Sequence, residues 1–320
     1  MKRIISAILF LALFAAMLAW ISACSQTGKR RISMNAQEQN PTKARLLELM
    51  KQEILLSYEM AESPLDICSS KIGGKPAVPS DFVWPEYSGT VYGDDESRLR
   101  PLSFMAQINL KDVAHLDEEN LLPKSGVLSF FYEPETMVCG FEPEDKGAAR
   151  VFYFPDETEL SAAACPDSIS DVMLPEFAVN FTRQISLPCY ESFDENDEYD
   201  FDDYEEWAAE LGYEFDEMGD RTKLLGYPDV IQSPMEEECE TVTRGYRLGT
   251  SQDYAKIPEA EKADIKEKSR EWMLLFQIGT ISGEEFELMF GDFGHIYFWI
   301  KKEDLLKRNF DDIWLVLQCG

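Results

Sequence analysis

The spacing of apolar positions changes from helical to extended near residue 70. Upstream of this point, apolar side chains recur every three or four residues: Leu47, Met50, Ile54 and Tyr58. Such spacing is typical of a helix with one buried face. Asn40 can cap the helix and Pro41 fits its first turn. We therefore expect a helix that begins at Pro41.

Downstream of residue 70, short apolar runs alternate with glycine and proline, a pattern that predicts strands and turns. The clearest runs are residues 102–110, 126–132, 151–154, 273–278, 286–290 and 295–300. The last two are joined by a glycine-containing loop, which predicts a hairpin. Helices are expected at residues 258–272 and at 204–213, the latter with Trp207 and Leu211 facing inward.

A weak internal repeat relates the two halves of the chain. Residues 104–108 resemble 274–278, and each segment is followed by a glycine-led aromatic strand. Upstream of these, residues 74–78 resemble 226–230. The order is the same in both halves, so we interpret the pattern as a duplication about a pseudo-two-fold axis. The sequence alone leaves this interpretation open.

The first 24 residues have the organisation of an exported bacterial lipoprotein. Lys2 and Arg3 precede an apolar run at residues 4–20, as in a signal peptide. Residues 21–24, Ile-Ser-Ala-Cys, resemble the lipobox of bacterial lipoproteins. This resemblance makes Cys24 the lipid-bearing residue.

The chain then divides into a signal peptide at 1–23, a flexible tether at 24–39 and a globular domain at 40–320. The alternative is a single N-terminal transmembrane anchor, because residues 4–23 have about the length that spans a bilayer. In both cases the domain is held at a membrane of the cell envelope.

The negative charge of the chain limits the kinds of molecule that it can bind. The chain has 30 basic and 60 acidic residues and a formal net charge of −30. Removing residues 1–23 takes away Lys2 and Arg3, which leaves 28 basic residues and a net charge near −32. Such a chain repels nucleic acid and attracts basic proteins. The apolar fraction of 45 % is that of a folded domain.

Residues 191–220 form an acidic block of 15 carboxylates without a basic residue. An unpaired carboxylate is costly to bury, so the block must lie on the surface. Six of its residues have EF-hand-like spacing: Asp194, Asn196, Glu198, Asp200, Asp202 and Glu205. Tyr199 stands where a calcium loop needs glycine. A solvated acidic face is therefore favoured over this weak calcium candidate, and no cofactor is expected.

Six further cysteines leave the thiol chemistry open: Cys68, Cys139, Cys165, Cys189, Cys239 and Cys319. Export into an oxidising compartment would favour disulfides. Isolated buried thiols fit the same sequence. Their spacing matches no metal-binding motif.

The sequence carries no catalytic signature. Its two histidines, His115 and His295, accompany no nucleophile motif, so a structural or surface role is favoured for both. Gln107 and Gln277 are polar residues within apolar runs, and a buried amide must be hydrogen-bonded. Together with Asp292 they are candidate ligand-binding or fold-centre residues.

Motifs along residues 42–320 follow the order found in a known bacterial family. They are residues 70–76 with 84–85, 101–110, 122–123, 126–132, 224–228 with Gln232, 272–278, 291–294 with 297–300, and 310–318. Together they resemble the YwqG-like family of uncharacterised function. The resemblance implies an α+β domain, mostly antiparallel sheet with a few helices. Relatives are mostly cytoplasmic and some lie near secreted-toxin genes, which implies an immunity role. The signal peptide and the acidic block depart from this family.

Two hypotheses for function follow. The first is a membrane-tethered, non-enzymatic binding protein of immunity type, whose acidic face engages a basic protein. The alternative is an envelope enzyme of unknown class with a pocket between the two halves, in which Asp292 acts with Gln107 or Gln277.

Overall fold

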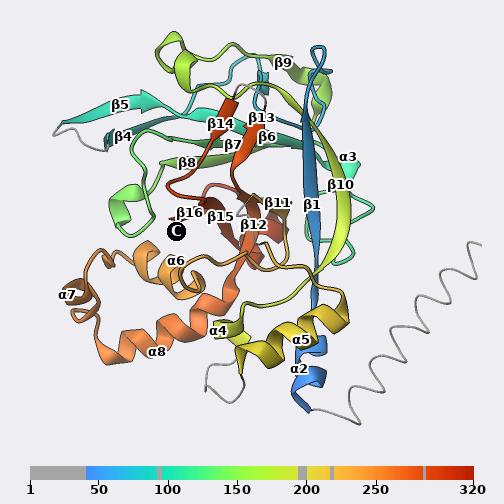
Figure 1. Ribbon diagram of the computed structural model, residues 1–320. Coiled ribbons are helices and arrows are strands. Elements are labelled where there is room, and N and C mark those ends of the chain that lie inside the picture. The colour runs from blue at the N-terminus through green and yellow to red at the C-terminus, as the bar shows by residue number, and fades with distance from the viewer. Residues whose placement is uncertain (1–40, 92–95, 194–199, 217–219, 284–285) are drawn as a thin grey trace, which may run out of the picture. The chain divides into compact units, whose positions relative to one another are not determined.

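The structure is a computed structural model that describes residues 41–91, 96–193, 200–216, 220–283 and 286–320 (Figure 1). Residues 51–320 form one compact unit. Residues 1–50 form a second unit, of which only helix α2 (Pro41–Leu49) is described. The expected signal peptide, the tether and Cys24 lie outside the described residues. None of the described helices is long and apolar enough to span a membrane.

Ten strands of residues 51–320 form one large sheet in the order β16-β15-β12-β11-β1-β10-β2-β6-β7-β8. In that order the strands are Trp314–Gln318, His295–Lys301, Trp272–Ile278, Thr222–Leu224, Lys51–Met60, Phe177–Ser186, Lys71–Ile72, Ser103–Asn109, Val127–Tyr132 and Ala149–Phe154. All neighbouring strands run antiparallel. The expected class, α+β with mostly antiparallel sheet, is confirmed.

Smaller elements surround this sheet. Three two-stranded sheets join β3 (Ala77–Pro79) to β9 (Leu160–Ala162), β4 (Glu86–Thr90) to β5 (Ser97–Pro101), and β13 (Ile281–Gly283) to β14 (Phe286–Leu288). The remaining α-helices of the described residues are α3 (Leu110–Val113), α4 (Tyr190–Phe193), α5 (Phe201–Leu211), α6 (Glu236–Thr243), α7 (Ser251–Tyr254), α8 (Glu259–Lys268) and α9 (Lys302–Lys307). Short 3-10 helices lie at Pro143–Asp145, Glu157–Glu159, Asp167–Val172 and Ser269–Glu271.

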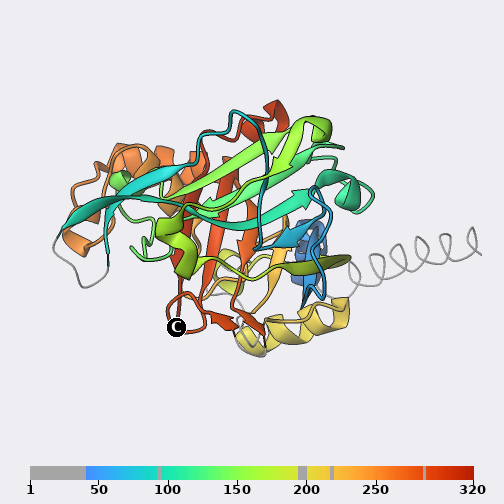
Figure 2. The same cartoon turned by 90° about the horizontal axis from the view of Figure 1, so that it is seen from above.

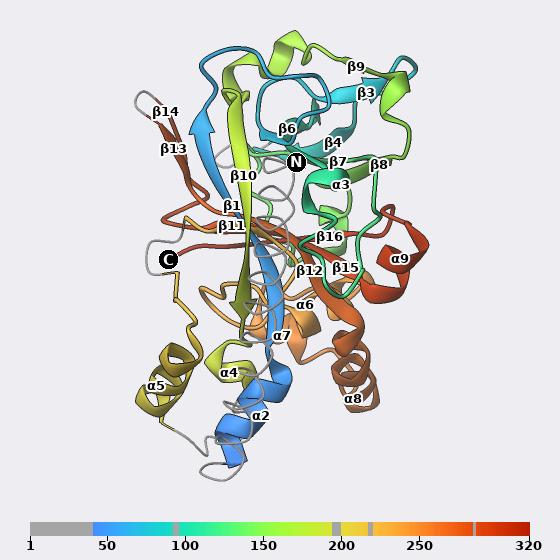
Figure 3. The same cartoon turned by 90° about the vertical axis from the view of Figure 1, so that its right-hand side faces the viewer.

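Strands β1 and β10 lie side by side at the centre of the sheet (Figure 3). They pair over ten residues, from Lys51 opposite Ser186 to Met60 opposite Phe177. Four strands follow on each side of this pair. The second strand on one side is β12 and on the other side β6, and both show a register shift, between Leu274 and Phe276 in β12 and between Phe104 and Ala106 in β6. These matched strands contain the segments of the internal repeat. The duplication itself stays a prediction.

The two sides of the sheet pack against each other through aromatic side chains. From above, β6, β7 and β8 cross over β12 and β15 (Figure 2). Phe130 on β7 lies 4.4 Å from Phe276 on β12, measured between ring centroids, and 5.3 Å from Phe298 on β15. All three rings are fully buried. This contact joins both sides of the sheet in one hydrophobic core.

The expectation of a helical stripe through Ile54 and Tyr58 was wrong. Helix α2 ends at Leu49, and both residues lie on strand β1. This strand is paired on one edge with β10 along its length and on the other edge with β11 at Ile54 to Leu56. Long-range pairing of this kind satisfies backbone groups on both edges, and it outweighs the helical spacing of the apolar residues.

The expected hairpin of residues 286–290 and 295–300 was also wrong. Strand β14 pairs with β13 instead, while β15 pairs with β12 and β16. The loop 291–294 therefore leads from a small two-stranded sheet into the main sheet. In the described part of the chain, all six cysteines are free thiols.

Candidate functional site

Lys223 is the centre of a buried ion network. Its Nζ lies 2.8 Å from Glu53 Oε2 and 2.7 Å from Asp229 Oδ2, and its side chain is fully buried. Arg221 Nη1 lies 2.9 Å from Asp229 Oδ1. Burial alone would raise the pKa of Asp229, but the charges of Lys223 and Arg221 bring it below the ordinary value. Asp229 is therefore held as a carboxylate.

A glycine turn after β11 places Asp229 in this network. Gly226 has φ 74°, and a Cβ there would lie 2.7 Å from Ser186 Oγ and 2.8 Å from Glu53 Cβ, so glycine is required. Beyond the turn, the Asp229 N–H donates to Gln277 Oε1 at 2.9 Å. Gln277 Nε2 donates in turn to Asp229 Oδ2 at 2.8 Å. The buried amide of β12 thus fixes the carboxylate.

Asp216 and His295 form a second pair beside Asp229. His295 begins β15 and is buried, and its Nε2 lies 3.1 Å from Asp216 Oδ2. The Tyr297 hydroxyl donates to the Asp229 carbonyl oxygen at 2.6 Å and lies 3.4 Å from His295 Nδ1. Burial alone would raise the pKa of Asp216, but its contact with His295 contributes to an overall lowering. Tyr297 thus connects the Asp216–His295 pair with Asp229 of the ion network.

Asp216, Asp229 and His295 line a cavity of about 290 Å³. Five aromatic side chains also line it: Tyr190, Phe201, Tyr204, Tyr213 and Phe215. Ring centroids of Tyr190 and Phe201 are 5.4 Å apart at 89°, and those of Tyr213 and Phe215 are 5.0 Å apart at 86°. These edge-to-face contacts hold the rings to one another.

Helix α5 carries two of these rings and ends at well-formed caps. Asp200 Oδ1 accepts the Asp202 N–H at 3.0 Å, and Gly212 ends the helix with φ 82°. The expected helix at 204–213 is confirmed, with a start three residues earlier and an end at Leu211. Its buried residues are Tyr204 and Ala208, whereas the expected inward residues, Trp207 and Leu211, are half-buried.

The cavity and its network are negative. The network holds three carboxylates and two cations: Glu53, Asp216 and Asp229 against Lys223 and Arg221. These five groups differ by one negative charge, without counting His295. Glu191 adds a further carboxylate, and no lysine or arginine is among the described residues that line the cavity. Aromatic faces and net negative charge together suit a cationic group.

The matched position in the other half is simpler. Lys71 Nζ lies 2.9 Å from Glu176 Oε1, as Lys223 does from Glu53, and Gln107 Oε1 accepts the Ala77 N–H at 2.9 Å. Ala77 thus makes the contact with Gln107 that Asp229 makes with Gln277. The first half therefore holds one ion pair where the second holds a network.

The structure does not bring Gln107, Gln277 and Asp292 into one site. Four strands separate β6 from β12, and Asp292 lies exposed in the loop 291–294. Gln107 Nε2 donates to the carbonyl oxygens of Ile67 and Ser69, at 2.7 Å and 2.8 Å. Both glutamine amides are thus used within the fold, which favours the fold-centre interpretation.

The calcium candidate is described only in part. Asp194, Asn196 and Glu198 lie outside the described residues. Asp200 caps α5, as given above, and Asp202 and Glu205 are exposed on that helix. Among the described residues, no group of three histidine, cysteine or acidic side chains is placed to hold a metal ion.

Replacing Lys223 tests the energetic weight of the network. Lys223→Gln leaves Glu53 and Asp229 buried without their shared cation, so we expect a loss of about 3–5 kcal/mol in the free energy of unfolding. Lys71→Gln is the matched control, because its partner Glu176 is partly exposed; its loss should be about 1–2 kcal/mol. Urea unfolding measures both. Equal losses would contradict this assignment.

Asp229→Asn should show a pH-dependent loss of stability. The lowered pKa of Asp229 means that its carboxylate stabilises the fold fully above about pH 4, and that this contribution disappears as pH falls through the lowered value. The difference in unfolding free energy between wild type and variant should therefore be largest near about pH 7 and shrink toward about pH 3. A difference that stays constant over this range would refute the expectation. The exposed Asp203→Asn is the control.

Comparison with known proteins places the chain in a family without an assigned activity. No curated protein matches it. Residues 70–319, most of the chain and nearly all of the compact unit, match the family described as a domain of unknown function (DUF1963). The chain therefore belongs to the DUF1963 family.

Proposed function

We propose that this protein is a membrane-tethered, non-enzymatic binding module that receives a basic side chain of a partner protein in its aromatic cavity. The observation that carries the proposal is the composition of the cavity lining: five aromatic rings and three carboxylates, with no described lysine or arginine. A lysine or arginine side chain would gain cation–π contacts there and meet net negative charge.

Exposed carboxylates on α5 extend the negative surface beside the cavity: Asp202, Asp203, Glu205 and Glu206. Phe201, on the same helix, is 45 % exposed, and Phe215 is 37 % exposed. Charges of one sign around a binding site speed the approach of a partner of opposite charge, and they make the encounter sensitive to salt. The surface thus supports a basic protein as the partner.

The tether in this proposal is a lipid on Cys24. The Ile-Ser-Ala-Cys sequence after an apolar run supports a lipoprotein of the cell envelope, with an uncleaved transmembrane anchor as the alternative. The resemblance to the YwqG-like family supports an immunity role, in which the basic partner is a toxin-type protein.

The alternative, an envelope enzyme, is favoured by one observation: the Asp216–His295 pair lines the cavity. A histidine oriented by a carboxylate can act as a general base. However, Cys189 is the only cysteine among the described residues of this lining. Burial raises the pKa of its thiol to about 11. A nucleophilic thiol needs a lowered pKa, so this arrangement favours binding over thiol catalysis.

Peptide binding tests the proposed recognition. The probe is a labelled peptide of alternating lysine and glycine, and its control replaces each lysine with norleucine. We expect the full-length protein to bind the lysine peptide only, with affinity that falls as salt rises. Phe215→Ala should weaken binding about tenfold, because it removes one aromatic face. Fluorescence anisotropy measures both effects, and mass spectrometry should find the peptide chemically unchanged.

Two control variants separate local recognition from general charge. Phe293→Ala removes a more exposed ring, in the loop 291–294, and Glu267→Gln removes an exposed carboxylate on α8. Neither should change affinity more than about twofold. Equal weakening by Phe215→Ala and Phe293→Ala would contradict the proposal, and chemical conversion of the peptide would favour the enzyme.

Labelling with a fatty-acid analogue tests the anchor. The wild-type protein should incorporate the label, and Cys24→Ala should abolish incorporation because the acylated thiol is missing. The matched control, Cys68→Ala, should leave it intact. Label that persists in Cys24→Ala would contradict a lipid on this residue.

A further inference from the structure

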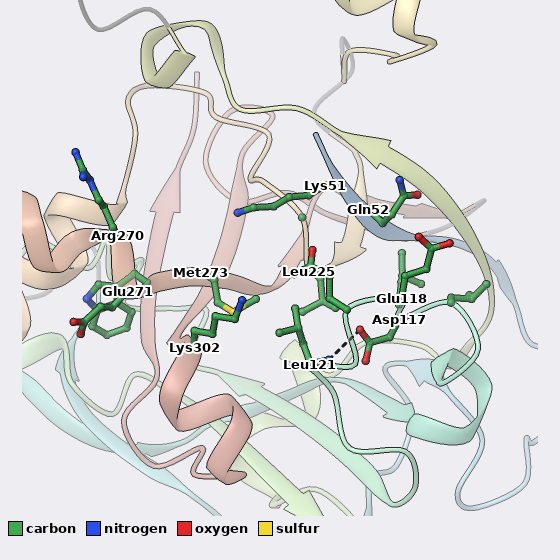
Figure 4. A pocket seen from close by; sticks show the side chains of 15 residues that line it. Lys51, Gln52, Asp117, Glu118, Leu121, Leu225, Arg270, Glu271, Met273 and Lys302 are labelled. Atoms are coloured by element: carbon green, nitrogen blue, oxygen red, sulfur yellow. Dashed lines mark hydrogen bonds between the residues drawn. The ribbon is translucent and has the colours of Figure 1, made fainter. Parts of the chain in front are cut away.

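A second cavity, of about 180 Å³, lies where the start of β1 meets the chain before β12 and the start of α9 (Figure 4). Its lining includes three cations, Lys51, Arg270 and Lys302. The side chains of Lys51 and Lys302 extend into the same space from different elements, with Met273 beside them (Figure 4). This cavity is separate from the aromatic one, since the two share no lining residue.

The three cations lack carboxylate partners within the described part of the chain. Lys51 Nζ lies 4.0 Å from the ring centroid of Tyr227, and no ion pair or hydrogen bond to its side chain is present among the described residues. The side chains of Lys302 and Arg270 likewise make no ion pair or hydrogen bond within the described part of the chain. This is unusual in a chain with twice as many acidic as basic residues.

Four carboxylates belong to the same lining: Asp117, Glu118, Glu119 and Glu271. Three of them have cations elsewhere. Asp117 lies 3.2 Å from Lys124 Nζ, and Glu271 lies 2.9 Å from Lys268 Nζ. Glu118 pairs with Arg183. These three acids are therefore partly neutralised from outside the cavity, whereas Glu119 is exposed and has no ion pair among the described residues.

Other cations of this chain collect several carboxylates each. Arg244 contacts Glu240, Glu261 and Asp264, at 2.7 Å, 3.0 Å and 2.6 Å. Lys51 and Lys302 make no such contact within the described part of the chain, although carboxylates line the same cavity.

The two lysines also repel each other across the cavity. Burial is the main cause that lowers the pKa of Lys51; the charges of Glu119 and Glu236 raise this pKa, and the charge of Lys302 lowers it by a smaller amount. An anion between the two ammonium groups would relieve this repulsion. It would also supply the acceptor oxygens that both groups lack.

We propose that the cavity between Lys51 and Lys302 binds a small phosphate-bearing anion. Two ammonium groups match the double charge of a phosphate monoester, and lysine binds phosphate as a point charge from several directions. The apolar side chains of Leu121 and Met273 in the lining leave room for a short uncharged substituent. This inference is independent of the proposed recognition of a basic partner, because the two cavities are separate.

Calorimetric titration of the full-length protein at low ionic strength tests the site. The three probes are inorganic phosphate, glycerol phosphate and monomeric dihexanoyl phosphatidic acid. Binding of the first two identifies a soluble phosphate compound as the source, and binding of the third alone identifies a lipid headgroup. Lys51→Gln and Lys302→Gln should each weaken binding about tenfold or more, because each removes a charged hydrogen-bond donor.

Lys307→Gln is the matched control, since this exposed lysine lies on the same helix as Lys302 and already contacts Glu303. It should bind phosphate as the wild type does. Lys302 is itself exposed, so its replacement leaves the fold intact even if Lys51→Gln is destabilised. Absence of binding by all three probes would overturn the proposal. The same conclusion would follow if Lys302→Gln and Lys307→Gln bound phosphate equally well.

Discussion

The pairing of β1 with β10 is the constraint on which the rest of this structure depends. These two ten-residue strands are hydrogen-bonded along their length at the centre of the sheet, and four strands are attached to each of them. Their partners lie more than 100 residues apart in sequence, from Lys51 opposite Ser186 to Met60 opposite Phe177. The pairing thus joins the two groups of strands into one continuous sheet, on which the core and the candidate site are built.

The ion network follows directly from that arrangement. Glu53 lies on β1 and Lys223 on the neighbouring strand β11, so strand pairing brings a buried carboxylate and a buried ammonium together. A buried ion pair is a poor source of stability, because desolvation offsets most of the attraction. The second carboxylate, Asp229, also lines the aromatic cavity, so it belongs to the candidate site as well as to the network. Ala77 makes the corresponding hydrogen bond with Gln107 and carries no charge.

Much of the fold could be predicted from the sequence, because strands buried on both faces leave long apolar runs. The runs at 102–110, 126–132 and 273–278 correspond to β6, β7 and β12. Strand β1 could not be identified in this way. Its apolar residues also fit helical spacing, and only its pairing with β10 and β11 decides the outcome. The partner of β14 was likewise decided by pairing that local sequence does not encode.

The candidate site was harder to predict than the fold. Gln277 was recognised as a polar residue in an apolar strand, but its partner Asp229 was not. One signal was present: residues 226–230 resemble 74–78, and Asp229 stands where the earlier segment has Ala77. Asp216 lies in the acidic block, where nothing in the sequence separates it from its exposed neighbours. Its contact with His295 across 79 residues is visible only in the folded chain.

The central claim is that aromatic side chains and carboxylates of one cavity hold a cation. Saturation-transfer NMR with tetramethylammonium tests it most directly, because the methyl protons of this cation report contact with aromatic protons of the protein. The account predicts transfer to the methyl groups in the wild-type protein. It also predicts that Phe215→Ala strongly reduces the transfer and that Phe293→Ala does not. Transfer that is absent from the wild type, or that Phe215→Ala leaves unchanged, would contradict the account.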